Sequence, residues 1–135
     1  MNLDYSDSDQ SFREEVQKFI RDNLPSTVKA KIDARKKLTK DDYMAWHKLL
    51  YGHGWVAPNW PTEFGGTDWT PLQCHIFDEE IGLAGVPRVL PFGVSMVGPV
   101  IMEFGTDTQK EYYLPRILSG EDVWCQGYSE PGSGS

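Results

Sequence analysis

Apolar residues recur at the spacing of one helical face near the beginning of the chain. We predict an amphipathic helix over Ser8–Leu24 from this periodicity. Ser8 or Asp9 can cap its first turn, and Pro25 ends the pattern. The apolar face of the helix consists of Phe12, Val16, Phe19 and Ile20.

Two further helices are predicted from their end signals as well as from their periodicity. One covers Thr39–Tyr51, with the threonine as its cap and glycines directly after it. The other begins at Thr70 and ends before Gly85, with Pro71 in the first helical position, where the missing N–H of proline does no harm. The loop between them, WVAPNWPTEFGGTDW, carries three tryptophans, and such large rings bury much apolar area. We therefore expect this loop to be packed down.

The next part of the chain is more apolar. The segment Val89–Phe104 is apolar nearly all round, a pattern typical of a buried central helix. Thr106 and Gln109 form a capping-box pattern, which predicts a last helix that ends at Gly120. The pattern up to Gly120 therefore predicts an all-α fold of about five helices.

After Gly120 the pattern changes from helix to strand. Residues 123–128, with the sequence VWCQGY, are rich in β-formers and predict a strand. No other segment of the chain predicts a partner for it. We expect this strand to be an unpaired edge, an arrangement that invites association with other chains.

Composition excludes several classes of protein. The chain has 135 residues, which fits one domain, and its 39% hydrophobic and 13% aromatic content argues against disorder. A net charge of −7 argues against nucleic-acid binding, and no apolar run is long enough for a membrane span. The first residues lack the features of a signal peptide, and Cys74 and Cys125 are expected to be free thiols. We therefore expect a cytoplasmic protein.

Basic residues gather in one segment of this acidic chain, residues 29–40. The segment holds a single acid, Asp33. Two interpretations stay open: a solvated, partly helical connection, or a contact with an anionic partner such as a nucleotide phosphate or a neighbouring subunit. The basic residues are Lys29, Lys31, Arg35, Lys36, Lys37 and Lys40.

Conventional catalytic and metal-binding patterns are missing from the sequence. His47, His53 and His75 show no metal-ligand spacing, so we expect each to be a surface or packed histidine and assign no metal site. Adjacent Glu79 and Glu80 point in different directions on a helix, which favours a role at the helix surface.

The last twelve residues, WCQGYSEPGSGS, are the most informative segment. A strand runs into a Pro-Gly turn with small residues, which lets backbone N–H groups and serine hydroxyls approach a ligand closely. Composition alone leaves a flexible linker equally open.

This run closely resembles the flavin-loop signature of acyl-CoA dehydrogenases, in which an Asp usually follows the final Gly-Ser. Trp60–Gly66, Phe77–Gly82 and Gly105–Pro115 resemble stretches of the same family in the same order. The resemblance extends from about Tyr5 to Ser135, and it implies that the chain is truncated inside the flavin loop.

The resemblance implies an N-terminal helical domain over residues 1–121, followed over residues 122–135 by the first strand and flavin loop of a middle β-domain. It implies an enzyme of fatty-acid metabolism that uses FAD to oxidise an acyl-CoA substrate: a glutamate base takes the α-proton and flavin N5 accepts the β-hydride. That base lies in a C-terminal part of the family, so no catalytic residue is assigned here and the chain alone should be inactive.

Positions in the motif imply the cofactor contacts. The segment Leu90–Met96 falls where the family shapes the floor of its acyl pocket. The last two residues of the chain match a position near the flavin diphosphate. Together the matched cofactor-binding residues are Gln126, Tyr128, Ser129, Gly134 and Ser135.

Two alternatives remain open at this point. Bacterial branches of the family that act on dicarboxylic or sterol-derived acyl-CoA pair two unlike subunits, and the wording WCQGYSEPGSGS is similar to theirs. The complete protein is therefore expected to be a homo-oligomer or a hetero-oligomer, with an electron acceptor that the sequence does not indicate. The alternative from another class is a free-standing helical interaction module.

Overall fold

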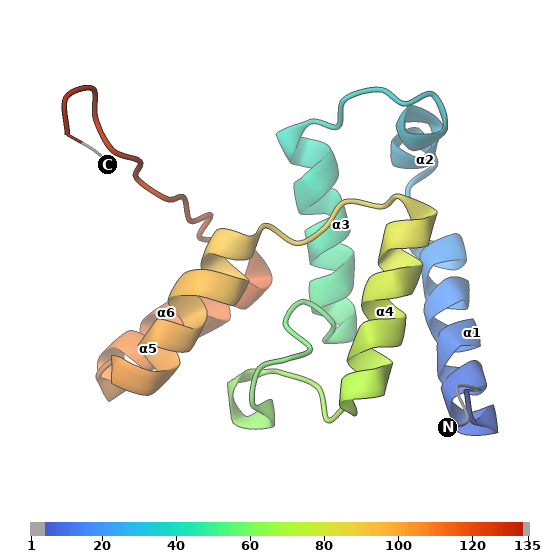
Figure 1. Ribbon diagram of the computed structural model, residues 1–135, viewed down its shortest axis with the longest axis horizontal. Coiled ribbons are helices and arrows are strands. Elements are labelled where there is room, and N and C mark those ends of the chain that lie inside the picture. Colours follow the sequence, from blue (N-terminus) through green and yellow to red (C-terminus); the bar gives the residue numbers. More distant parts are fainter. Residues whose placement is uncertain (1–4, 134–135) are drawn as a thin grey trace. The chain divides into compact units, whose positions relative to one another are not determined.

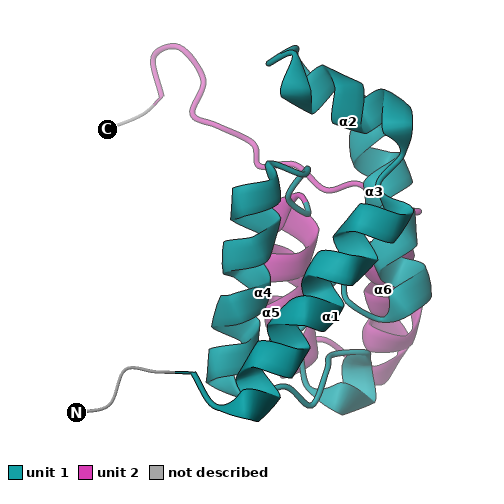
Figure 2. Cartoon of the chain, turned by 90° about the vertical axis from the view of Figure 1, so that its right-hand side faces the viewer, with its two compact units in different colours: residues 1–89 teal, residues 90–135 magenta. Residues whose placement is uncertain are grey.

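The computed structural model describes residues 5–133, and these residues form helices joined by loops, with no β-strand among them (Figure 1). This confirms the predicted all-α fold. The chain divides into two compact units, residues 1–89 and residues 90–135 (Figure 2). The elements are α1 Asp7–Asn23, α2 Ser26–Asp33, α3 Lys40–His53, the 3-10 turn η1 Thr62–Phe64, α4 Pro71–Ala84, the π-helical segment η2 Phe92–Val97, α5 Gly98–Phe104 and α6 Asp107–Ser119.

In the first unit, α1 and α4 lie side by side although they are far apart in sequence (Figure 1). The predicted apolar face of α1 is buried as expected. Phe19 also packs its ring near Trp46 of α3, with centroids 5.8 Å apart. The largest fully buried side chains of this unit are Trp46, Leu50, Ile76, Val16 and Val28.

Local capping sets most helix starts. The side chains of Thr39, Thr70 and Thr106 each accept a hydrogen bond from the backbone N–H three residues on, and the side chain of that later residue accepts one from the backbone N–H of the threonine. The prediction that Ser8 or Asp9 caps α1 was wrong. Ser6 is the cap, because Asp9 stands at the third helical position and completes a capping box with it.

The tryptophan loop is packed down, as predicted. Trp55 and Trp60 are buried, and the ring of Trp69 meets that of Trp55 with centroids 5.2 Å apart. A Cβ on Gly66 would lie 1.7 Å from the carbonyl oxygen of Trp60, so the close turn of this loop requires glycine.

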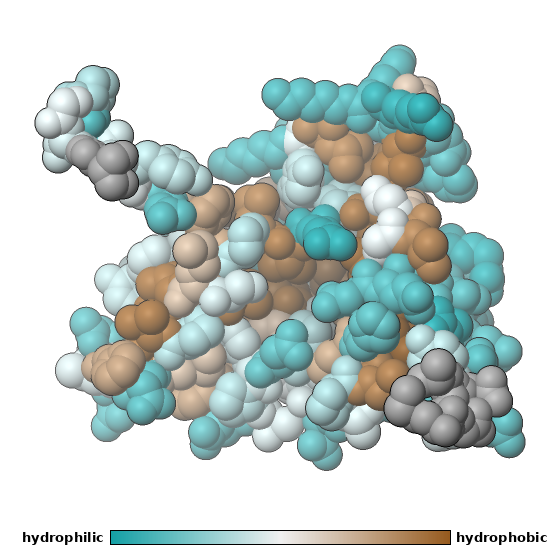
Figure 3. All heavy atoms as spheres, viewed as in Figure 1, coloured by the Kyte–Doolittle hydropathy of each residue, from teal (hydrophilic) through white to brown (hydrophobic). Residues whose placement is uncertain are grey.

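The second unit consists of η2, α5 and α6, and it corrects one prediction. Residues 89–104 do not form a buried central helix. They form the π-helical η2 and the short α5, which leave Met96 48%, Val100 54% and Phe104 81% exposed. The physical reason is that within this unit α5 packs on α6 and η2, so apolar side chains on its other faces stay uncovered. Figure 3 shows apolar side chains at the surface of this unit.

The strand expected over residues 123–128 does not form, which is a second correction. Residues 123–130 are in neither helix nor strand. A strand takes its hydrogen bonds from a neighbouring strand, and the described residues provide none. Of the described helices, none combines the length and the apolar character that crossing a bilayer demands.

The basic segment is partly helical, as one of its two interpretations expected. It covers the second half of α2 and the connection to α3. Lys29 pairs with Asp33 at 2.8 Å, and Lys31 pairs with Asp42 at 2.6 Å. The second pair ties the segment to the first turn of α3.

Candidate functional site

The candidate site is the segment that follows α6. Gly120 ends the helix in the left-handed conformation, with φ of 73°, and turns the chain away from the helix axis. Residues 121–133 then continue without regular structure and finish in a turn, in which the Ser133 N–H donates to the Glu130 carbonyl at 2.9 Å (Figure 1).

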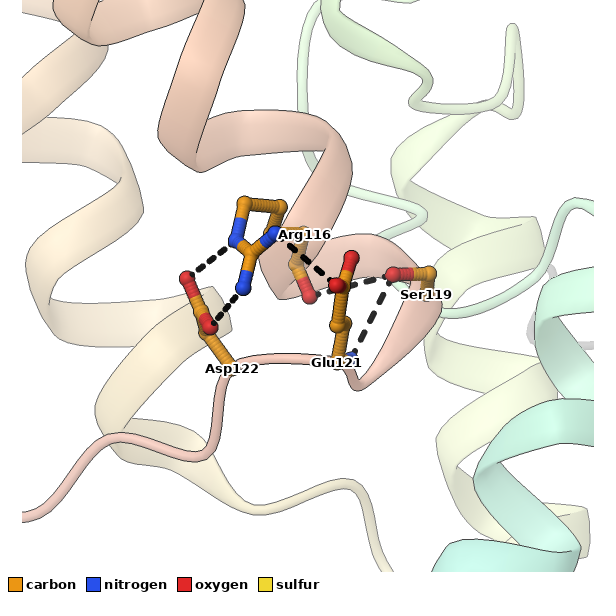
Figure 4. Close-up of polar contacts among 4 residues, drawn as sticks. All are labelled: Arg116, Ser119, Glu121 and Asp122. Carbon is orange, nitrogen blue, oxygen red and sulfur yellow. Dashed lines mark hydrogen bonds and ion pairs between the residues drawn. The ribbon is translucent and has the colours of Figure 1, made fainter.

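Arg116 of α6 holds the start of this segment (Figure 4). Its Nε and Nη2 donate to the two carboxylate oxygens of Asp122, each at 2.8 Å, and its Nη1 donates to Glu121 at 2.8 Å. The guanidinium also lies over the ring of Tyr112, 5.0 Å from its centroid. The hydrogen bonds from Arg116 lower the pKa of Asp122, and the same bonds raise the pKa of Arg116.

Trp124 is the second point at which the segment is held. Its ring meets that of Tyr113 edge to face, with centroids 5.6 Å apart. It also lies close to Gly93 of η2, where an added Cβ would be 3.4 Å from Trp124 Cδ1 and 3.0 Å from Ile117 Cγ2. The Trp124 Nε1 is buried and, within residues 5–133, has no hydrogen-bond partner.

The residues that the sequence predicts to contact the cofactor come shortly after Trp124 in the chain. Gln126, Tyr128 and Ser129 are all exposed, and none of their side chains makes a hydrogen bond to another described residue. An amide, a phenol and an aliphatic hydroxyl are therefore available as donors in a stretch of four residues. Gly134 and Ser135 lie outside the described residues. The roles of all five residues stay predictions.

The glutamate pair of α4 corrects another prediction. Glu80 is not a surface residue: its side chain is 6% exposed and faces α1. One carboxylate oxygen accepts a hydrogen bond from Arg13, and the other accepts one from Gln17 at 3.0 Å. Glu79 is 38% exposed, and its Oε2 lies 2.7 Å from Arg13 Nη1 but receives no aligned hydrogen bond from any described residue. The pair belongs to the packing of α1 on α4.

Histidines and cysteines form no chemical centre in the part of the chain that is described. His47 is buried, and His53 packs its ring against Trp55 and Phe19, with centroids 4.2 Å and 4.5 Å apart. Cys74 and Cys125 are free thiols, as predicted. No group of three or more potential metal ligands occurs among residues 5–133.

Sequence reasoning missed Arg116 and Asp122. The available signal was an arginine four residues before a helix-ending glycine, followed by an acidic pair directly after that glycine. Such spacing brings the three side chains together only if the glycine adopts the left-handed conformation, which the sequence suggests but does not guarantee.

Comparison with known proteins identifies relatives of the whole chain. The family model for the N-terminal domain of acyl-CoA dehydrogenases matches residues 6–121. Acyl-CoA dehydrogenase IpdE1 of Mycolicibacterium smegmatis is 36% identical over 131 residues, which cover 93% of this chain and 33% of that protein. Mitochondrial isovaleryl-CoA dehydrogenase of Arabidopsis thaliana is 34% identical over 139 residues, which cover 99% of this chain and 32% of that protein.

Solved structures agree with these sequence relatives. A chain of the ChsE4-ChsE5 complex from Mycobacterium tuberculosis superimposes with a TM-score of 0.76 at 32% identity, over 99% of this chain and 33% of that chain. The steroid ACAD Tcur3481-Tcur3483 superimposes with a TM-score of 0.81 at 31% identity, over 99% of this chain and 34% of that chain. The chain thus spans about a third of the length of the relatives it matches.

Proposed function

Because the chain belongs to the acyl-CoA dehydrogenase family, in which it matches the N-terminal helical domain, we propose that it is the N-terminal part of a longer FAD-dependent acyl-CoA dehydrogenase. The proposed reaction is the α,β-dehydrogenation of an acyl-CoA thioester. The 135 residues contribute to the walls of the flavin and acyl sites and do not supply the catalytic base.

The observation that carries this proposal is the segment after α6. Gln126, Tyr128 and Ser129 present hydrogen-bond donors that no other described residue uses, and Gly132 adopts a positive φ of 90° in a turn whose backbone carries no side chain that would keep a ligand away. The ring nitrogens and oxygens of an isoalloxazine accept such hydrogen bonds. The residues present therefore fit FAD.

FAD, when bound, supplies the acceptor for the β-hydride. The part of this chain is to bind and orient it. Gln126 and Ser129 would donate hydrogen bonds to the flavin ring, and Tyr128 would cover apolar ring surface with its own ring. A hydroxyl of Ser129 placed at the flavin ring would stabilise negative charge that develops there, so it would act on the rate more than on folding.

The second unit supplies the proposed acyl pocket. Leu90 is 39% exposed and Met96 is 48% exposed within this chain, so both have apolar surface that an acyl chain can cover. The segment from Leu90 to Met96 passes through Gly93, where an added Cβ would lie 3.0 Å from Ile117 Cγ2 and 3.4 Å from Trp124 Cδ1. This close packing supports a defined position for the floor of the pocket.

A heteromeric assembly is the second candidate, and the comparisons favour it over a homo-oligomer. Two of the solved relatives carry paired component names, ChsE4-ChsE5 and Tcur3481-Tcur3483, and the second is described as a steroid ACAD. We propose a sterol-derived acyl-CoA as the substrate class to test first. If the complete protein expressed alone binds FAD at one flavin per chain and forms a single homo-oligomer, the heteromeric candidate fails.

The experiment for the proposed function uses the complete protein that contains this chain. Purified protein is examined for the visible absorbance of oxidised flavin and is then titrated anaerobically with straight-chain and sterol-derived acyl-CoA thioesters. Bleaching of the flavin by an acyl-CoA, but not by free CoA, is the expected result. Purified protein with no flavin, even after incubation with FAD and expression with a second subunit, would contradict the proposal.

A further inference from the structure

The contact between Arg116 and the two residues after Gly120 belongs to no role described so far. The guanidinium of Arg116 donates two parallel hydrogen bonds of 2.8 Å to the carboxylate of Asp122, and its third nitrogen donates one to Glu121 (Figure 4). The guanidinium also lies over the ring of Tyr112. Only arginine presents donors in this planar arrangement.

Apart from the side chain of Arg116, two hydrogen bonds hold the chain where it leaves α6. After Gly120, the Asp122 N–H donates to the Arg116 carbonyl at 3.2 Å, and the Glu121 N–H donates to the Ser119 hydroxyl at 3.4 Å. The first lies at the upper end of the usual range and the second beyond it, and the left-handed glycine before them is the most permissive residue for a change of direction. The side chain of Arg116 therefore supplies the strongest restraint on the path of residues 121 and 122.

The chain that leaves α6 is held at two points, two residues apart, and these two points set its direction. Asp122 is held by Arg116, and Trp124 is held by the ring of Tyr113. Both anchoring side chains come from α6, so the outgoing segment is fixed to one rigid helix. The side chains of Gln126, Tyr128 and Ser129 lie beyond the second anchor, where they make no hydrogen bond to the described residues.

We propose that Arg116 is a positioning residue. By hydrogen bonding to Asp122 it sets the direction in which residues 123–129 leave α6. It thereby presents Gln126, Tyr128 and Ser129 to the flavin. This inference rests on the proposed function for the identity of the ligand. Arg116 touches neither cofactor nor substrate in this role. It acts through the path of the backbone.

A positioning role differs from a merely structural one in what it leaves unchanged. The Arg116 and Asp122 side chains are 29% and 28% exposed, so solvent and salt screen their attraction and the pair adds little to global stability. Its removal should loosen residues 121–129 locally and weaken flavin binding, while the unfolding transition of the protein stays in place.

The test uses Arg116→Gln, Asp122→Asn and their double variant in the complete protein. Hydrogen–deuterium exchange of peptides covering residues 120–129 is measured without FAD, and the FAD dissociation constant is measured by flavin fluorescence. Arg21→Gln is the matched control, because Arg21 is an exposed arginine of α1 at 3.8 Å from Asp22. Urea unfolding of every variant separates local loosening from global instability.

We expect both single variants to raise exchange over residues 120–129 and to weaken FAD binding by about threefold to fivefold, which is the effect that the loss of one screened ion pair can have. The double variant should lose no more FAD affinity than either single variant, because each single substitution already removes the one interaction between Arg116 and Asp122. Arg116→Lys should bind FAD little better than Arg116→Gln, since lysine cannot donate two parallel hydrogen bonds to Asp122. The control should change neither readout.

Unchanged exchange and unchanged FAD affinity in Arg116→Gln would overturn the inference and leave the proposed function standing. Additive losses in the double variant, or a loss matched by a lower urea midpoint, would also overturn it. A wild-type protein that holds no flavin would refute the proposed function and the ligand part of the inference, while the exchange data would still decide whether Arg116 fixes the segment. If Arg116→Gln does not fold, Asp122→Asn tests the same hydrogen bonds from the other side.

Discussion

Replacing Glu80 by glutamine tests how α1 is held on α4. Glu80 offers one carboxylate oxygen to Arg13 and the other to Gln17, and its side chain is almost completely buried. Glutamine keeps the shape of the side chain but removes its charge. It also turns an NH₂ group toward one of two donors, so at least one of the two hydrogen bonds is lost.

The size of the effect follows from this geometry. A hydrogen bond to a charged group contributes about 1.5–3 kcal/mol. Breaking a fully buried ion pair costs about 3–5 kcal/mol, but Arg13 is 16% exposed and keeps Glu79 as a neighbour, so the lower range applies. We expect Glu80→Gln to lower the free energy of unfolding by about 2 kcal/mol, a large part of a typical total of about 5–15 kcal/mol.

Glu79→Gln is the matched control, because it removes the adjacent carboxylate that faces the same arginine. Glu79 is 38% exposed as a whole, but its Oε2 is buried 2.7 Å from Arg13 Nη1 and receives no aligned hydrogen bond from the described residues, so its loss should cost about 1 kcal/mol, less than the loss of Glu80. Urea unfolding followed by tryptophan fluorescence is the assay, since Trp46, Trp55 and Trp69 lie in the same unit. With a slope of about 2 kcal/mol per molar urea, the midpoint of Glu80→Gln should fall by about 1 M. Equal shifts for the two variants would refute this account of the α1–α4 contact.

Three further predictions address other parts of the chain. Lys31 and the α3 cap lower the pKa of Asp42 from 3.8 to about 2, so its stabilising contribution is present above about pH 4 and is lost as the pH falls through 2. Asp42→Asn should therefore make the free energy of unfolding depend less on pH at the acid end. Asp33→Asn, in an exposed pair, should leave that dependence unchanged, and equal effects of the two variants would contradict this. Gly66→Ala should unfold the tryptophan loop, because the new Cβ has no room beside the Trp60 carbonyl, and unchanged near-ultraviolet circular dichroism would contradict it. The 135-residue chain alone should bind FAD weakly or not at all in a fluorescence titration, because a few hydrogen bonds of about 0.5–1.5 kcal/mol each do not offset an association cost of about 4 kcal/mol or more.

Local signals in the sequence predicted much of the fold. The starts at Thr39, Thr70 and Thr106 were correct because a capping box involves only four consecutive residues. The cap of α1 was misplaced by two or three residues because several neighbouring polar residues could each serve as the cap. Periodicity gave the buried face of that helix but not its neighbour.

Long-range contacts could not be predicted in the same way. Glu80 meets Gln17 and Arg13 from 63 and 67 positions away, and nothing in its own surroundings marks it as buried. The apolar character of residues 89–104 suggested burial, but within the second unit only one face of α5 is covered. A strand was predicted from composition, and composition carries no information on whether a partner strand exists.

The candidate site was located by its resemblance to the flavin loop, which placed Gln126, Tyr128 and Ser129 in one segment. The structure added how that segment is held. The fork of Arg116 on Asp122 depends on a left-handed turn at Gly120, and the contact of Trp124 depends on where η2 packs. Neither follows from the motif itself.

The central claim is that this chain contributes flavin contacts to an acyl-CoA dehydrogenase, and Ser129→Ala in the complete protein tests it most directly. The measurement is the rate of flavin bleaching by a saturating acyl-CoA in a stopped-flow instrument, with Ser26→Ala, an exposed serine at the start of α2, as the control. The account predicts that Ser129→Ala slows flavin reduction by about tenfold or more, or roughly 1.4 kcal/mol of barrier, while the control reduces at the wild-type rate. A Ser129→Ala enzyme that is reduced as fast as the wild type would remove this residue from the flavin site and contradict the claim.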